Sequence, residues 1–395
     1  MNLQAPTIRR PACAASPMPT PMLLDTDRDP VVVMGGGLAG LYAAWRLTQV
    51  GAEVVLLEAQ QRLGGRILSE PLPGLTHAAG ATCDLGPTWY WPAMQTRLPQ
   101  LIRQLGLHAF EQPADGAALF EPSLGHRQRM AYSPAMAGSM RLRGGMASLI
   151  TALASHIDPG RVRLGHRVVG LHRVDGALEL DIAAGDGGPG RRLRATAVIC
   201  TLPPRLLAWR VSFDPPLPDA VIDGWSAVPT WMAAQAKFVA VFERAFWRDA
   251  GLSGQAQSRV GPLVEIHDAT EPGGQPALFG FVGVPADVRR KAGAQLHQAA
   301  LAQLQRLFGP DAAAPLCTFY KDWADDPFIA TSDDETAPPS HPAYGAHAAM
   351  PGCWQRRLWL AGTESACEHG GYLEGALEAA ELAVQQLLAQ LPTTG

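Results

Sequence analysis

The chain has 395 residues, of which 47% are hydrophobic and 17% charged, and its formal net charge is −4. This composition predicts two or three domains with a large buried core. No stretch reaches the ~20 apolar residues of a membrane span. Basic residues do not cluster with aromatic ones, which argues against a nucleic-acid partner. The six cysteines are scattered without a Cys-x-x-Cys pair. We therefore expect neither a disulfide framework nor a zinc site, and a cytoplasmic location.

The N-terminal region predicts a disordered tail followed by a strand–turn–helix–strand unit. Residues 1–29 contain five prolines and many alanines without apolar periodicity, which is typical of a solvated tail. The run VVVMGGGLAGLYAAWRL, from Val31 to Leu47, then predicts a buried strand, a glycine turn and a helix. VVLLEA follows as a second buried strand, which ends at Glu58 and Ala59.

The glycine turn has the spacing of a dinucleotide-binding site. Gly35, Gly37 and Gly40 form G-x-G-x-x-G directly after the first strand. The first two glycines let the backbone turn and approach a pyrophosphate, and the third lets helix and strand pack closely. The helix N-terminus offers free N–H groups to the phosphates. Glu58 lies about 20 residues further on, where a carboxylate can accept hydrogen bonds from an adenosine ribose.

The next segments predict a second glycine turn, two helices and a small sheet. RLGGRI is the glycine turn, and DLGPTWYWP is a Gly-, Pro- and Trp-rich segment. Apolar residues recur at helical spacing from Met94 to Leu105, and a second amphipathic helix is expected within Gly144–Ile157. The runs VRL, RVVGLH and ALELDI, separated by Gly and Asp turns, predict an antiparallel meander inserted between the parallel strands.

The C-terminal half returns to the pattern of the first unit. AVICTLPP, from Ala197 to Pro204, predicts a buried parallel strand ended by prolines, and AKFVAVF and PALFGFVGV predict a second sheet. A helix is expected between Val288 and Phe308, and a loop over Asp325–Pro342. RLWLAG then predicts a strand, and a long helix begins near Gly371. Because this strand–helix unit resembles the first, we expect the nucleotide-binding domain to be discontinuous.

In these blocks the chain resembles the flavin-containing amine oxidases, a family of monoamine, polyamine and L-amino-acid oxidases. The blocks are GGGLAGL, LLEA with RLGGRI, DLGPTW, GGM, AVICTLPP, KFVAVFERAFW, KDW and LAGTES with GGYLEGALEA. The resemblance extends from about Val31 to Val384 and implies an α/β fold. This fold has a discontinuous Rossmann-like FAD-binding domain, of the glutathione-reductase and amine-oxidase type, with an inserted α+β substrate domain. The expected FAD-binding segments are 30–103, 144–228 and 334–392, and the expected substrate-binding segments are 104–143 and 229–333.

The resemblance also implies which residues bind FAD. The glycines of the first turn and Glu58 would hold the AMP half, and Arg66 would reach the pyrophosphate or ribityl chain. Val168 would meet adenine through its backbone, and the helix that begins near Gly371 would aim N–H groups at the pyrimidine edge of the flavin. The implied FAD-binding set is Gly35, Gly37, Leu38, Ala39, Gly40, Glu58, Ala59, Gly65, Arg66, Gly86, Pro87, Thr88, Trp89, Val168, Gly362, Thr363, Glu364, Gly371, Tyr372 and Leu373.

Three residues match the chemical centre of the family. Lys237 aligns with a lysine that holds a water against flavin N5, and a lysine in an apolar strand is costly unless paired or hydrated. A snorkelling edge-strand lysine is the alternative. Tyr372 matches one wall of an aromatic substrate cage, although a packed core tyrosine would have the same pattern. Trp323 matches a tryptophan beside the flavin ring and could equally be a core residue. The expected substrate pocket comprises Trp89, Trp231, Tyr344 and Tyr372.

The chain also departs from the family pattern at several positions. The stretch AYGAHAAMPG has no cysteine where covalently flavinylated members carry one, so non-covalent FAD is expected. The second cage tyrosine falls at Tyr344 or Gly345, and if glycine is the match the cage is half open. Trp89 stands where L-amino-acid oxidases carry a carboxylate-binding arginine, which favours an amine without an α-carboxylate. No histidines have ligand spacing, so no metal is expected.

These observations predict FAD-dependent oxidation of a primary or secondary amine to an imine, then to aldehyde and ammonia, with O2 reduced to H2O2. An FAD-dependent C–C desaturase or dehydrogenase of the same fold is the alternative enzyme, and a flavin-binding protein without turnover is the alternative from another class. The sequence leaves open which amine is used, whether it is a monoamine or a diamine, which acceptor takes the electrons, and the oligomeric state.

Overall fold

The computed structural model describes residues 22–23, 29–72, 82–131, 136–183, 190–345 and 350–390. Most of the expected tail lies outside these ranges. Two of its residues, β1 (Met22–Leu23), pair in parallel with β13 (Arg191–Ala195), so the prediction of disorder is wrong for these two. The tail therefore supplies one edge of a sheet through backbone hydrogen bonds, which composition alone does not reveal.

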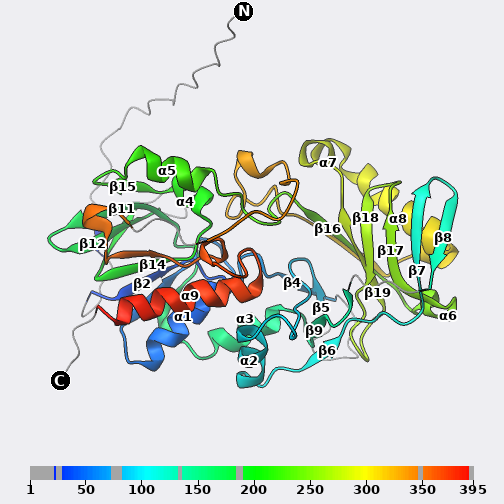
Figure 1. Cartoon of the computed structure of the whole chain (residues 1–395), viewed down its shortest axis with the longest axis horizontal. Helices are drawn as coiled ribbons and strands as arrows, with labels where there is room; N and C mark the ends of the chain where they lie inside the picture. Colours follow the sequence, from blue (N-terminus) through cyan, green and yellow to red (C-terminus); the bar gives the residue numbers. More distant parts are fainter. Residues whose placement is uncertain are drawn as a thin grey trace, which may run out of the picture.

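The half of the molecule on the left of Figure 1 contains the predicted dinucleotide-binding turn, and we call it the nucleotide-binding half. It is built on a five-stranded parallel sheet. Its order is β10 (Val162–Arg163), β3 (Val54–Leu57), β2 (Val31–Met34), β14 (Ala197–Cys200) and β21 (Leu358–Leu360). Every neighbouring pair in it is parallel. The strands come from four distant parts of the chain, which confirms the discontinuous α/β fold.

Alternate residues of the parallel strands enter two different cores. Val31 and Val33 face helices α1 (Leu38–Gln49) and α9 (Leu373–Leu388), which lie side by side. Val32 and Met34 face the other layer, the sheet β1-β13-β12-β11-β15. Its remaining strands are β11 (Val168–Val174), β12 (Ala177–Ile182) and β15 (Ser212–Asp214). Burial on both faces explains why these parallel strands read as unbroken apolar runs.

The meander differs from the prediction at its first strand. β11 and β12 form the expected antiparallel pair, and β13, which the sequence analysis did not identify, pairs antiparallel with β12. VRL does not join these strands, because β10 pairs in parallel with β3 at the edge of the nucleotide-binding sheet. A strand of two residues carries too little alternation to indicate its partner. Helices α4 (Pro204–Arg210) and α5 (Asp219–Ser226) lie on either side of β15 in the chain.

The other half contains a seven-stranded sheet that ends at β20 and β8. Its order is β20 (Cys317–Asp322), β16 (Ala236–Val241), β19 (Ala277–Val282), β18 (Leu263–Asp268), β17 (Leu252–Ser258), β7 (Ala117–Ser123) and β8 (His126–Met130). Helix α8 (Ala294–Phe308) covers one face. The opposite face packs on Cys83 and Leu85 and faces the nucleotide-binding half.

The expected helix between Val288 and Phe308 is two helices. Gly293 has φ +47°, and it ends α7 (Ala286–Ala292) before α8 begins. The remaining elements are α2 (Arg97–Gln104), α3 (Ala147–Ala154), α6 (Phe246–Asp249), β4 (Ser69–Pro71), β5 (Thr82–Asp84), β6 (Ala109–Glu111) and β9 (Met140–Leu142). Met94 precedes α2 and is exposed, so it lies outside the buried helical stripe. The domain boundaries stay a prediction.

Among the residues that the structure describes, no helix combines the length and the apolar composition that a membrane crossing requires.

Candidate active site

One cavity of about 440 Å³ connects the glycine turn after β2 to the seven-stranded sheet. Most of the residues expected at the site line it. These are Gly35, Gly37, Leu38, Ala39, Glu58, Ala59, Gly65, Arg66, Gly86, Pro87, Thr88, Trp89, Val168, Trp231, Lys237, Trp323, Thr363, Gly371, Tyr372 and Leu373. Gly40, Gly362, Glu364 and Tyr344 do not line it. The sequence positions thus converge on one continuous space, although their roles there stay predictions.

The first glycine turn needs glycine for two physical reasons. Gly35 has φ +102°, a conformation that side chains disfavour. A Cβ at Gly40 would collide with the carbonyl oxygen of Gly35, so its absence from the cavity wall reflects a packing role. Gly37 is the N-cap of α1, and no side chain caps this helix end. The free N–H groups therefore remain available to an anion at the cavity wall.

Glu58 stands at the end of β3 with both carboxylate oxygens engaged. The backbone N–H of Gly36 donates to one oxygen at 2.6 Å, and the N–H of Gln60 donates to the other at 2.7 Å. Burial raises the pKa of Glu58, and these hydrogen bonds oppose the rise. The carboxylate is thus fixed beside the turn, with lone pairs left for a ribose hydroxyl.

Glu364 acts on the cavity through Arg66. The Arg66 guanidinium lines the cavity and forms a two-point ion pair with the fully buried Glu364, at 2.7 and 3.2 Å. It also donates to the carbonyl oxygen of Trp231 at 3.3 Å. Burial lowers the pKa of Arg66, but Glu364 outweighs it and the net shift is upward. The guanidinium is therefore held as a fixed positive charge in the wall, and Glu364 is placed behind it.

Lys237 is buried in the cavity wall on β16, with 2% of its surface exposed. Its Nζ donates to the Thr88 hydroxyl at 2.6 Å and to the Gly86 carbonyl at 2.9 Å, and it lies 4.0 Å from the centre of the Phe279 ring. Desolvation lowers its pKa to about 7. This geometry excludes the alternative of a snorkelling edge lysine, because the head group is enclosed and β16 lies between β20 and β19.

Among the described residues, four tryptophans line the cavity, and three of them, Trp89, Trp231 and Trp323, are held by contacts with other side chains or backbone. Trp89 donates from Nε1 to Gln112 at 2.7 Å, and its ring meets those of His267 and Phe279. Trp323 donates to the carbonyl oxygen of Leu85 at 3.0 Å and is 6% exposed. Trp231 lines the cavity from the segment before β16, and its ring lies 4.4 Å from that of His341. The wall near Lys237 is therefore aromatic and preorganised.

The two tyrosines expected to form a cage, Tyr372 and Tyr344, both contact His341, and of these three residues only Tyr372 lines the cavity. Tyr372 is the N-cap of α9, and the imidazole of His341 stacks on its ring at 5.2 Å with 12° between the planes. Tyr344 stands edge-on to His341 at 5.6 Å, and its hydroxyl donates to the carbonyl oxygen of Pro229. Tyr344 packs against Gly370, where a side chain would collide with it. His341, which the sequence analysis did not select, thus takes the position beside Tyr372.

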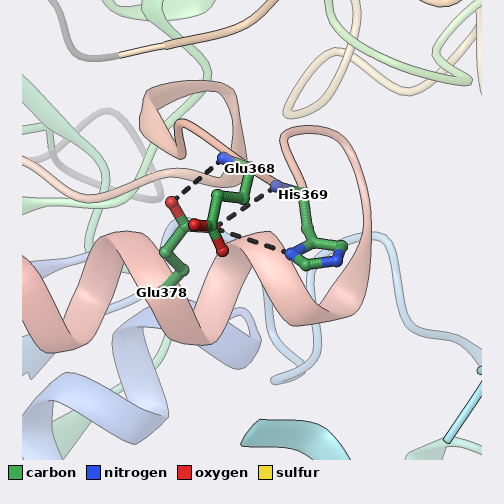
Figure 2. A group of neighbouring side chains, drawn as sticks. All are labelled: Glu368, His369 and Glu378. Atoms are coloured by element: carbon green, nitrogen blue, oxygen red, sulfur yellow. Dashed lines mark hydrogen bonds and ion pairs between the residues drawn. The ribbon is translucent and has the colours of Figure 1, made fainter. Parts of the chain in front are cut away.

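The loop before α9 is held by a carboxylate of the helix itself. Figure 2 shows Glu378 reaching back to the loop, where it accepts hydrogen bonds from the backbone N–H groups of Glu368 and His369. It also accepts a hydrogen bond from the backbone N–H of Cys367. Glu368, His369 and Glu378 also lie close enough to offer ligand atoms to one ion. The oxygens of Glu378 are already used by the loop, so the cluster is explained as a support for the start of α9. This start brings Gly371 and Leu373 to the cavity.

Several lining residues escaped the sequence analysis. Phe281 lies opposite Lys237 in the β16–β19 register, so alternation along PALFGFVGV could have identified it. His166 and Arg167 line the cavity beside Val168, within the same segment. Trp91 lies in DLGPTWYWP, and Thr201 and Leu202 lie in AVICTLPP, two segments that were recognised without these residues being selected. The others come from segments without a recognisable signal, and these are Arg210, Gln235, Pro327, Phe328 and Ile329.

The cavity joins a glycine turn of the dinucleotide-binding type to a buried lysine on the seven-stranded sheet. The model of the family described as flavin containing amine oxidoreductase matches residues 38–121 and 114–388, and the chain belongs to this family. The family resemblance expected from the sequence is confirmed. Membership makes the protein an amine-oxidase-type oxidoreductase with a flavin cofactor.

Curated relatives and solved structures agree with this assignment. Putrescine oxidase of Kocuria rosea is 26% identical, over 93% of this chain and 97% of the relative. The L-amino acid dehydrogenase of Synechocystis sp. is 23% identical, over 91% of this chain and 95% of the relative. The structure of cyclohexylamine oxidase from Brevibacterium oxydans has a TM-score of 0.75 at 19% identity, and it covers 92% of this chain and 100% of that one. At this identity the structural likeness supports the fold alone.

Proposed function

We propose that the protein oxidises a primary or secondary amine to an imine, while O2 is reduced to H2O2. Water then converts the imine into an aldehyde and ammonia, or into an aldehyde and a primary amine when the substrate is a secondary amine. The observation that carries the proposal is Lys237, a buried lysine with a pKa of about 7 in a cavity whose wall also contains Trp89, Trp231 and Phe281. Bound FAD would supply the acceptor for the hydride equivalent that leaves the carbon bearing the amine.

The residues of the nucleotide end fit FAD. The turn at Gly35 and the uncapped N-terminus of α1 would receive the pyrophosphate, and Glu58 would receive the adenosine ribose. Val168 would meet adenine, and Arg66 would contribute its positive charge toward the phosphate and ribityl region. The N-terminus of α9, at Gly371 and Leu373, would direct N–H groups to the flavin edge that becomes negatively charged.

The lysine end fits an amine in its neutral form. An apolar, aromatic wall disfavours an ammonium ion and so favours the neutral amine, whose lone pair assists cleavage of the neighbouring C–H bond. The Nζ of Lys237 uses two of its bonding directions on Gly86 and Thr88. A third direction is left for a water or the substrate nitrogen, and a pKa of about 7 lets Nζ gain or lose a proton there near neutral pH.

An anaerobic titration of the yellow holoenzyme with amines, amino acids and apolar alkenes tests the proposal. Bleaching of the flavin band by amines, with peroxide formed when air returns, supports an amine oxidase. Bleaching without peroxide indicates a dehydrogenase with another acceptor, and bleaching by alkenes alone indicates a desaturase. The Lys237→Met variant should be reduced at least about tenfold more slowly. Reduction as fast as in the parent contradicts the role given to Lys237.

We propose that FAD is bound non-covalently, because the stretch AYGAHAAMPG, part of which lies outside the described residues, contains no cysteine. Acid precipitation should release the yellow colour into the supernatant. A yellow pellet would instead indicate a covalent bond to the protein.

A further inference from the structure

We infer that the substrate is a monoamine with one apolar substituent, and that a diamine is rejected. The inference rests on the proposed function and concerns the substrate end of the cavity. This end is defined by Lys237 together with the apolar and aromatic residues Trp89, Trp231, Phe281, Trp323, Phe328 and Ile329.

The substituent of the amine would meet aromatic surface on several sides. The ring of Trp89 lies 6.3 Å from that of Phe281, and Phe281 stands directly across from Lys237 in the sheet register. Trp323 and Ile329 belong to one buried apolar cluster that reaches the cavity from the segment after β20. Such walls exclude water from an apolar group and gain stabilisation from its burial.

A second ammonium group would enter this end without a carboxylate partner. Within the described ranges, Glu58 is the only carboxylate that lines the cavity, and it belongs to the glycine turn at the nucleotide end. Of the undescribed internal segments, 73–81, 132–135 and 346–349 contain no Asp or Glu, whereas 24–28 contains Asp25 and Asp27 and 184–189 contains Asp186. An ammonium at the substrate end would therefore have to lose its hydration without gaining an ion pair.

The carboxylates just behind the substrate end are already paired. Asp322 forms a two-point ion pair with Arg289, Asp326 pairs with Lys321, and Glu364 pairs with Arg66. Asp84 accepts from Ser69 and from the backbone N–H of Met146, and Asp268 accepts from Arg248. To turn any of them toward a substrate would leave its present partner buried and unpaired, so none is a free receptor for a second cation.

Lys237 is the charged side chain of this end. It carries a proton over part of the neutral pH range, and the nearby Asp84 favours that protonated form. Protonated Lys237 would repel a second ammonium. Contact with aromatic faces attracts cations, but this gain is smaller than the loss of hydration when no anion is present. The balance of desolvation and repulsion favours a substrate that carries a single nitrogen.

A matched pair of substrates tests the inference on the holoenzyme. Hexylamine and 1,5-diaminopentane have the same number of heavy atoms and differ only in a terminal methyl or amino group. In anaerobic stopped-flow experiments, the ratio of flavin reduction rate to Kd should be at least about 100-fold higher for hexylamine. A diamine that is equal or better overturns the inference and leaves the proposed function standing. Reduction by neither amine overturns both.

A charge introduced at the substrate end provides a second measurement. Phe328→Glu should raise the relative efficiency of 1,5-diaminopentane at least about tenfold over Phe328→Gln, which has the same length without the charge. The visible FAD spectrum of both variants reports whether the cofactor site is intact. An equal substrate ratio in the two variants contradicts the view that charge at this end decides between monoamine and diamine.

Discussion

Replacement of Lys237 by methionine should change how folding stability depends on pH. Burial lowers the pKa of this lysine from 10.5 to about 7. Between these two values the unfolded chain holds the proton and the folded chain does not, so protonation favours unfolding. At 1.36 kcal/mol per pH unit, the buried lysine costs roughly 5 kcal/mol of stability near pH 7, and this cost disappears as the pH approaches 10.5.

Methionine has no such titration but loses the hydrogen bonds to Thr88 and to the Gly86 carbonyl. Leaving these groups unpaired costs about 1–3 kcal/mol each, at every pH. The difference in folding stability between variant and parent therefore combines a gain from removing the buried lysine with a loss of hydrogen bonds. Its dependence on pH comes from the titration of Lys237 alone. The stability of Lys237→Met minus that of the parent should fall by about 1.4 kcal/mol per pH unit above pH 7.

Denaturant unfolding of both FAD-free proteins at about pH 7, 8 and 9 measures this slope, and all other titrating groups cancel in the difference. A difference that stays constant over this range refutes the reasoning, because it means that Lys237 keeps an ordinary pKa in the folded protein.

Three further substitutions follow from the same contacts. Gly40→Ala places a methyl group against the Gly35 carbonyl, so it should cost about 3 kcal/mol or more and abolish the flavin spectrum. Gly224→Ala, whose methyl group meets open space on helix α5, should instead raise the free energy of unfolding by up to about 1 kcal/mol in thermal unfolding. Glu374→Gln should lower stability by about 2–4 kcal/mol in denaturant unfolding, because the fully buried carboxylate accepts three backbone N–H groups at the start of α2. Thr88→Val should shift the pH profile of flavin reduction to lower pH by up to about one unit, and Thr88→Ser should restore it.

The sequence predicted the nucleotide end well because its signals are local. Strand β2, the turn at Gly35, helix α1 and strand β3 follow one another within one short run, and Glu58 comes directly after them. The spacing of the glycines is a direct consequence of backbone geometry, which tertiary contacts do not alter. Lys237 was also detectable, since a lone charge in a fully buried strand requires a partner or a chemical role.

The substrate end was less predictable because it is assembled from contacts that sequence spacing does not encode. Arg66 and Glu364 are 298 residues apart, and only the fold places the carboxylate behind the guanidinium instead of in the cavity. The contact between His341 and Tyr372 was unpredictable for a similar reason. Tyr344 is anchored by its hydroxyl to Pro229 and packed against Gly370, and the imidazole of His341 stacks on the ring of Tyr372.

The two ends of the cavity differ in predictability because they bind different kinds of molecule. Members of this flavin-containing family share a flavin cofactor, so short sequence motifs that fix the backbone can encode its contacts. The substrate differs, and its selection depends on which side chains from β16, β19 and the segment after β20 meet, and on which carboxylates are already paired. In this chain, ion pairing with Arg289 and Lys321 fixes Asp322 and Asp326 beside the substrate end. Arg289 and Lys321 therefore determine whether a carboxylate is free to bind a substrate at this end, although neither side chain lines the cavity.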